Sequence, residues 1–169
     1  MAATAVEPVR EVEIFRSQNK FIWLSVEKNC AEVTHEESLV RPQPGGNSMN
    51  WIVGHLLCVY NNVLPMLGQP PVMLTEKLKR YDRGSQQVTA ETALPFEELL
   101  AGLKEAIDRW DAGLAAATNE ALDRKAPFSP FNDPNETVRS VIGFLMFHQG
   151  YHTGQTGVLR RVIGKAGSM

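Results

Sequence analysis

The sequence predicts an all-α protein, a four-helix bundle with long crossover connections. Four segments place apolar residues at the three- and four-residue spacings of a helix that is apolar on one side. No segment alternates apolar and polar residues for long enough to predict a strand, and the nearest, residues 72–78, is short and unpaired. The connections hold about 17 to 27 residues, whereas simple bundles use roughly 2–8. We therefore expect connections that cross the bundle or cover part of it.

The first two helices are predicted over residues 8–29 and 48–67. An N-cap for the second is expected at Asn47 or Ser48, because their side chains accept hydrogen bonds from the free N–H groups of a first turn. Pro65 removes a backbone donor near the end of this helix. We therefore expect the last turn to kink or fray.

The other two helices are predicted over residues 95–118 and 133–163. The third has a regular apolar stripe, formed by Phe96, Leu99, Leu103, Ile107, Trp110 and Leu114. The stretch DPNE is predicted to open the fourth helix. Asp133 would be its N-cap, Pro134 would take the first helical position, and Glu136 would complete a capping box.

Composition and charge narrow the class of protein. The 169 residues are 43% hydrophobic and 21% charged, which is typical of a globular chain, and we expect one domain over 1–169. A net charge of −2 does not favour nucleic-acid binding, which needs many Lys and Arg directed at phosphates. No apolar run reaches the roughly 18 residues of a membrane span, and no signal peptide is evident. Cys30 and Cys58 form no CxxC pair, so we expect a cytoplasmic protein with reduced thiols.

Three of the four histidines fall on core-facing stripes. His148 and His152 are four residues apart and share one face of the fourth helix, while His55 interrupts the apolar stripe of the second. A third imidazole from a neighbouring helix would complete a facial set of three nitrogen donors, which suits Zn, Ni, Fe or Cu. The alternative is a group of hydrogen-bonded core histidines. Three buried imidazoles without a metal would be hard to satisfy.

Two blocks carry a resemblance to a known family. NSMNWIVGHLL, which contains His55, and FHQGYHTGQTGVLRRVIG, which contains HxxxHxGQ, resemble the DinB/YfiT-like superfamily, whose members are proposed to be metalloenzymes. The resemblance implies a DinB/YfiT-like bundle, often dimeric, whose metal is held by three histidines, here His55, His148 and His152. The expected cofactor is a divalent transition metal, with Zn or Ni favoured and Fe or Mn as alternatives. Relatives include thiol-dependent transferases or isomerases and hydrolases, and the resemblance does not select among them.

Four further residues are predicted to surround the site. Gln155 and Asn62 each lie seven residues after a histidine, and each either orients a metal ligand or closes a helix–helix hydrogen bond. Tyr151 either reaches the pocket with its hydroxyl or packs as an aromatic, and Trp51 is expected in the pocket wall or the core. Cys58 lies about 60° off the His55 stripe, as a fourth ligand or as a small hydrophobic residue.

The two histidine stripes carry no acidic residue, and this bears on mechanism. A metal hydrolase often needs a carboxylate base, which would have to come from a loop residue such as Asp82, Glu91 or Asp133. Activation of a thiol needs less, because the metal itself lowers the pKa of the thiol. We therefore expect a metal-dependent enzyme that activates a low-molecular-weight thiol, or water, toward a small-molecule substrate. Arg80 and Arg83 in the second connection either bind a carboxylate on the substrate or thiol, or are solvated surface residues. No catalytic residue is assigned, and the alternatives are a metal-dependent hydrolase or a non-catalytic dimer that binds a metal or a small ligand.

Glycines on the fourth helix predict a homodimer. Gly143, Gly150, Gly154 and Gly157 cluster opposite the histidines, where small residues allow another backbone to approach closely. The back of the second helix is also apolar, with Val53, Leu57, Tyr60 and Leu64. We expect a second subunit to bury both faces. The alternative is that the long loops cover them within one chain.

Overall fold

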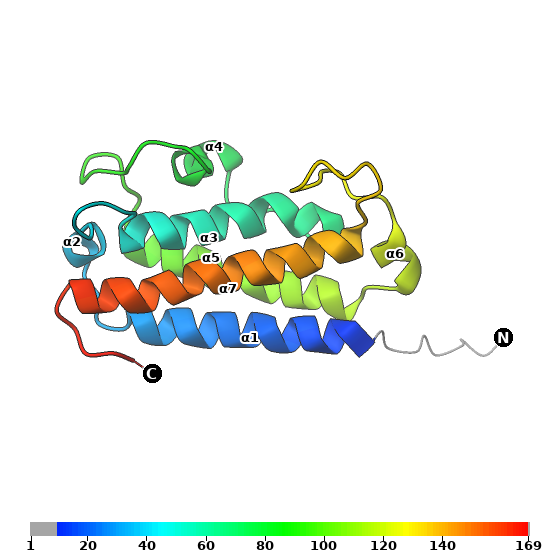
Figure 1. Cartoon of the computed structure of the whole chain (residues 1–169), viewed down its shortest axis with the longest axis horizontal. Coiled ribbons are helices and arrows are strands. Elements are labelled where there is room, and N and C mark those ends of the chain that lie inside the picture. The colour runs from blue at the N-terminus through cyan, green and yellow to red at the C-terminus, as the bar shows by residue number, and fades with distance from the viewer. Residues whose placement is uncertain (1–9, 169) are drawn as a thin grey trace.

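The computed structural model describes residues 10–168, and this part of the chain forms a four-helix bundle without strands, as predicted (Figure 1). The long helices are α1 (Arg10–Cys30), α3 (Met49–Val63), α5 (Phe96–Ala115) and α7 (Val138–Val162). The short elements are α2 (His35–Ser38), η1 (Leu64–Leu67), α4 (Thr75–Leu78), η2 (Lys79–Tyr81) and α6 (Asn119–Asp123). The predicted start of the first helix at residue 8 lies outside the described residues. None of the described helices is long and apolar enough to cross a membrane.

The arrangement of the long helices explains the long connections. α1 packs against α5 and α7, and α3 packs against the same two helices, so α1 and α3 lie at opposite corners. Asn29 contacts Thr156 at one end of the α1–α7 pair and Glu11 contacts Arg139 at the other, so these two helices run parallel. α3 and α5 also run parallel (Figure 1). Two consecutive helices that run parallel need a connection that returns along the length of the bundle. Two consecutive helices at diagonal corners need a connection that crosses the end of the bundle.

α7 begins four residues later than the sequence analysis predicted. Asp133 does not cap a helix, because its Oδ1 accepts a hydrogen bond from the Asn135 N–H, 2.8 Å away, in a local turn. The N-cap is Thr137, which forms a capping box with Ser140. The backbone preceding Val138 is instead tied to the segment after α6 by an isolated β-bridge. Tertiary pairing therefore overrides the capping pattern of DPNE.

The ends of α3 follow the predicted chemistry more closely. Ser48 is the N-cap, and its Oγ accepts a hydrogen bond from the Trp51 N–H at 3.3 Å. Pro65 falls in the 3-10 turn η1, which replaces the last α-helical turn, and Gly68 ends it with a φ of +71°. The nearest candidate for a strand, residues 72–78, contains the helical turn α4 instead.

The back of α3 is covered within one chain. Val53, Leu57 and Leu64 are fully buried and Tyr60 is 1% exposed, because α5 and the segment from η1 to η2 lie against them. The prediction that a second subunit buries this face is therefore wrong. α3, which carries His55, is buried on nearly every side, so this candidate metal ligand has a rigid support.

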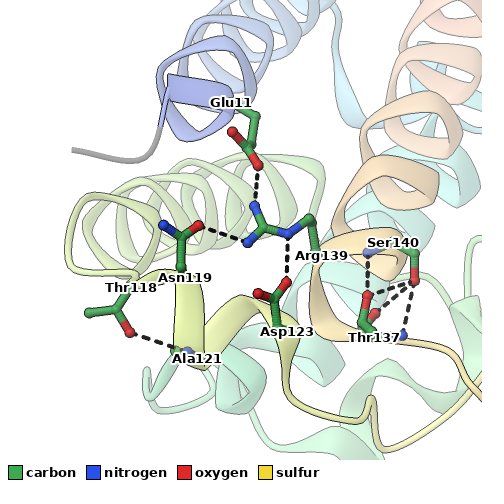
Figure 2. Close-up of polar contacts among 8 residues, drawn as sticks. All are labelled: Glu11, Thr118, Asn119, Ala121, Asp123, Thr137, Arg139 and Ser140. Carbon is green, nitrogen blue, oxygen red and sulfur yellow. Dashed lines mark hydrogen bonds and ion pairs between the residues drawn. The ribbon is translucent and has the colours of Figure 1, made fainter. Parts of the chain in front are cut away.

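Arg139 ties the beginning of α7 to two other helices (Figure 2). Its Nε donates to Asp123 Oδ1 at 2.9 Å, and its guanidinium also contacts Asn119 of α6 and Glu11 of α1. The side chain is 25% exposed, so it is partly shielded from water. These contacts fix the register of α7 against α1 at the end of the bundle opposite to Val162, where α7 ends.

We predict that Arg139→Met lowers the free energy of unfolding by about 1 kcal/mol, because one guanidinium joins three partners in a partly buried network. Urea denaturation followed by circular dichroism measures this change. Arg16→Met is the matched control, since Arg16 makes a single, more exposed ion pair with Asp111 and should contribute less. Equal effects of the two substitutions would contradict the proposed importance of the network.

Candidate metal centre

The three predicted histidines meet where α3 packs against α7. Their ligand nitrogen atoms all lie within 4.8 Å of one another. The closest pair is His55 Nε2 and His148 Nε2, which are 3.3 Å apart. His55 is 4% exposed, whereas His148 and His152 are half-buried, so the cluster is partly accessible to solvent. Three donors from two helices are therefore brought together with one side open.

Hydrogen bonds at Nδ1 fix the tautomers of His55 and His148. The carbonyl oxygen of Tyr81 lies 2.7 Å from His55 Nδ1, and because a carbonyl can only accept, this nitrogen carries the proton. Gln149 donates its Nε2–H to the carbonyl of Leu56 at 3.2 Å, which orients its amide. Its Oε1 then accepts from His148 Nδ1 at 3.1 Å. In the neutral rings, both Nε2 atoms therefore present lone pairs.

The distance between these two Nε2 atoms fits a shared cation. Two facing lone pairs at 3.3 Å repel each other unless a positive centre lies between them. Two nitrogen ligands at roughly 2.0–2.1 Å from a tetrahedral ion lie about 3.3–3.4 Å apart. Three neutral imidazoles are ligands that suit Zn and Ni as well as other transition metals. The residues present therefore fit a divalent transition metal.

His152 has its own polar partner and an aromatic neighbour. Its Nδ1 lies 2.8 Å from Gln155 Oε1, so Gln155 orients this imidazole and does not serve as a helix–helix link. The ring of Tyr151 meets the His152 ring edge-on with centroids 5.1 Å apart, and Tyr151 is 59% exposed. Tyr151 thus forms part of the rim of the site.

Of the remaining predicted residues, one lies at the site and two do not. Trp51 stacks on the His55 ring at 4.8 Å and donates its Nε1–H to Ser85 Oγ at 3.1 Å, so it forms a wall of the site. Asn62 is exposed, and its amide contacts Cys58 Sγ at 3.6 Å. Burial raises the pKa of the Cys58 thiol to about 11, which keeps it protonated, and its sulfur is not part of the cluster.

Sequence reasoning missed Tyr81 and Gln149. Tyr81 is fully buried, and its ring occupies the space over Gly54, where an added Cβ would lie 2.3 Å from the ring. Its hydroxyl accepts a hydrogen bond from the Leu94 N–H at 2.8 Å. The glycine immediately before His55, within an otherwise apolar helix, was the available signal for this close approach. Gln149 is fully buried, and its signal in the sequence was an amide side chain immediately after His148.

The loop carboxylates considered as bases differ in their placement. Asp82 follows Tyr81, whose carbonyl bonds His55, and the charge of Asp82 raises the pKa of His55 against the larger lowering effect of burial. Glu91 accepts a hydrogen bond from Thr89 in an exposed turn. Asp133 caps its own turn before α7. Among these three, Asp82 is the carboxylate whose charge acts on a histidine of the cluster.

Comparisons with known proteins show the family and the fold of the chain. Residues 22–156 match the family model of the DinB superfamily. The chain belongs to the DinB superfamily. No curated protein matches the sequence. Two solved structures share the fold of this DinB superfamily member. A conserved protein from Enterococcus faecalis has 17% identity and a TM-score of 0.70 over 89% of this chain and 95% of its own. YfiT from Bacillus subtilis has 18% identity and a TM-score of 0.68 over 97% of this chain and 95% of its own, and is described as a probable metal-dependent hydrolase with an unusual four-helix bundle topology.

Burial lowers the pKa of all three imidazoles, that of His152 to about 4. Unfolding returns each histidine to a pKa near 6.5, so between pH 6.5 and 4 the unfolded chain binds more protons. We predict that the metal-free protein keeps its full stability above pH 6.5 and loses stability as the pH falls below it. Urea midpoints measured from pH 7.5 to 5 test this, because the carboxylates titrate lower. His152→Gln should flatten the slope, and an unchanged slope would contradict the assignment.

Proposed function

We propose that the protein is a metal-dependent enzyme that binds one divalent transition metal through His55, His148 and His152 and acts on a small-molecule substrate. The observation that carries this proposal is the 3.3 Å distance between the Nε2 atoms of His55 and His148. The Nδ1 atom of each ring already donates a hydrogen bond, so each Nε2 presents a lone pair. The description of YfiT as a probable metal-dependent hydrolase supports it. Zn and Ni are the favoured metals, because three imidazoles form a nitrogen-only ligand set.

Thiol activation is the first of two routes that the site supports. A divalent metal held here supplies positive charge that lowers the pKa of a coordinated thiol or water. The histidine-bearing faces of α3 and α7 bring no carboxylate against the three rings in the described chain. The protein itself then provides orientation, through Gln149, Gln155 and the stacked Trp51. A low-molecular-weight thiol that transfers to a small substrate needs no further base.

Hydrolysis is the second route, and a specific residue favours it. Asp82 lies next to the residue that orients His55, and its carboxylate is exposed. A carboxylate in this position could accept a proton from an attacking water. The Asp82 side chain accepts a hydrogen bond from the Arg83 N–H at 2.8 Å, which holds it in the turn.

Metal content gives the direct test of the proposed cofactor. We predict about one equivalent of a divalent metal in untagged protein and a loss of at least about ten-fold in affinity for His148→Ala, because two imidazoles bind far more weakly than three. Elemental analysis after dialysis against dilute chelator measures both. His35→Ala is the control, since His35 accepts a hydrogen bond from the Phe96 N–H away from the cluster and its loss should leave the metal in place. Metal well below one equivalent in wild type and variant alike would refute the proposal.

We also propose that α7 pairs with a second copy of the chain. The outer face of α7 is uncharged from Gly143 to Val158, and Phe147, Tyr151 and Val158 are each more than half exposed. An added Cβ at Gly143, Gly150 or Gly154 would meet no atom within 4 Å, so this face is open to a neighbour.

The face on α7 continues across a groove to α1. Phe21 is 65% exposed and lines this groove together with Gly150 and Val158. Gly157 differs from the other glycines, because it faces Asn29 of α1 within the same chain. Contiguous exposed apolar surface of this kind is typical of protein interfaces.

We predict that the wild-type protein sediments as a dimer and that Phe147→Glu shifts it to a monomer, because a charge would be buried without a partner at the contact. Sedimentation velocity at micromolar concentration measures the shift. Leu74→Glu is a matched control, because Leu74 is 73% exposed but lies in the α3–α5 connection. A monomeric wild type, or dimers unaffected by Phe147→Glu, would argue against pairing through α7.

A further inference from the structure

A turn of the long α3–α5 connection lies along one edge of the histidine cluster. At its beginning, the carbonyl oxygen of Tyr81 accepts the His55 Nδ1–H bond at 2.7 Å. At its end, Ser85 Oγ accepts from Nε1 of Trp51, whose ring stacks on His55. Tyr81 and Ser85 are four residues apart, and each bonds a residue at the same corner of the site. Residues 82–84 therefore have little freedom to lie elsewhere.

The turn between these anchors is itself well defined. The Ser85 N–H donates to the Asp82 carbonyl at 3.1 Å, which closes a four-residue turn. Gly84 occupies its third position with a φ of +81°, a conformation that side chains other than glycine rarely adopt. Ser85 Oγ donates to the Arg80 carbonyl at 2.8 Å and braces the turn from behind. Arg83 therefore occupies the corner of a turn fixed at both ends.

Arg83 and Arg80 differ in what their guanidinium groups do. Arg80 donates to the carbonyl oxygen of Thr92, so it links two parts of the α3–α5 connection. The guanidinium of Arg83 makes no hydrogen bond or ion pair with any of the residues that the structure describes, and the residue is exposed. Arg83 lies two residues after Tyr81, whose carbonyl bonds His55, and two residues before Ser85, which bonds Trp51, so it is held beside the cluster.

We propose that Arg83 binds a carboxylate on the small molecule that meets the metal, so that the site selects anionic substrates or thiols. This inference rests on the proposed function, because it assigns a substrate class to the same metal centre. A guanidinium with free donors forms charge-assisted, often bidentate hydrogen bonds with carboxylates. The two anchors hold the backbone of Arg83 close to the cluster, so a small molecule bound at the metal lies near this guanidinium.

The charges around the cluster agree with an anionic ligand. Three histidines bind a metal through neutral imidazoles, so they leave a divalent ion without a compensating charge. Asp82 is the first residue of this turn, and its carboxylate accepts the Arg83 backbone N–H. An anionic ligand at the metal, beside Arg83, would supply the missing charge.

Two thiols of similar length test the proposal in cobalt-loaded full-length protein. The probes are 3-mercaptopropionate, which carries a carboxylate, and 2-mercaptoethanol, which carries none, and the thiolate-to-cobalt absorption band reports binding of each. We expect Arg83→Gln to weaken mercaptopropionate binding by about ten-fold and to change mercaptoethanol binding less than about two-fold, because a charge-assisted hydrogen bond is lost with the first probe alone. Lys79→Gln is the matched control. It removes the same charge from the same connection, where Lys79 pairs with Glu76.

The outcomes separate this inference from the proposed function. If wild-type protein takes up no cobalt, the metal proposal itself fails. If cobalt binds but Arg83→Gln weakens both thiols equally, or neither, the assignment of Arg83 is overturned while the metal centre stands. An equal effect of Lys79→Gln on mercaptopropionate would overturn it as well, because the preference would then reflect net charge. Wild-type protein that binds neither thiol would likewise overturn it.

Discussion

Much of the site depends on how Tyr81 is held against α3. Its ring fills the space over Gly54, its hydroxyl accepts the Leu94 N–H, and its carbonyl accepts the His55 Nδ1–H. A side chain at position 54 would displace the ring, so a single glycine permits the crossover connection to lie this close to the helix. The same contact that secures the loop thus sets the tautomer of a candidate metal ligand. Tyr81 therefore serves both the packing of the connection on α3 and the orientation of His55.

The order of the helices supplies the loops that the site uses. Parallel packing of α3 and α5 forces a connection back along the bundle, and this connection carries Tyr81, Ser85 and the turn with Arg83. An up-and-down bundle with short loops would bring the histidines together but would leave His55 without its carbonyl partner. Polar bonds in the core then fix the register, as where Tyr60 donates to Asn19 at 2.7 Å. Metal-site candidates on rigid helices, with loop residues at the rim, are an arrangement suited to chemistry on small molecules.

Both faces of α7 are used in the proposed function, and they differ in character. The inner side presents His148 and His152, each with an amide oxygen at Nδ1. The outer side is uncharged and rich in glycine and exposed aromatic residues. Tyr151 belongs to both, since its ring touches His152 while most of its surface is exposed. Pairing through this face would therefore cover part of the rim of the site.

The sequence by itself determined the helical class, the four long helices and the three histidines, because periodicity and spacing are local properties that a helix converts directly into a common face. It also indicated Gln155 and Trp51, which lie within a turn of a histidine. It placed Asn62 wrongly, since seven residues along a helix keep a direction but add about 10 Å of distance. Tyr81, the choice of Arg83 over Arg80 and the late start of α7 were decided by the tertiary structure alone. Each depends on a contact between segments far apart in the chain, and no local pattern encodes which segments meet.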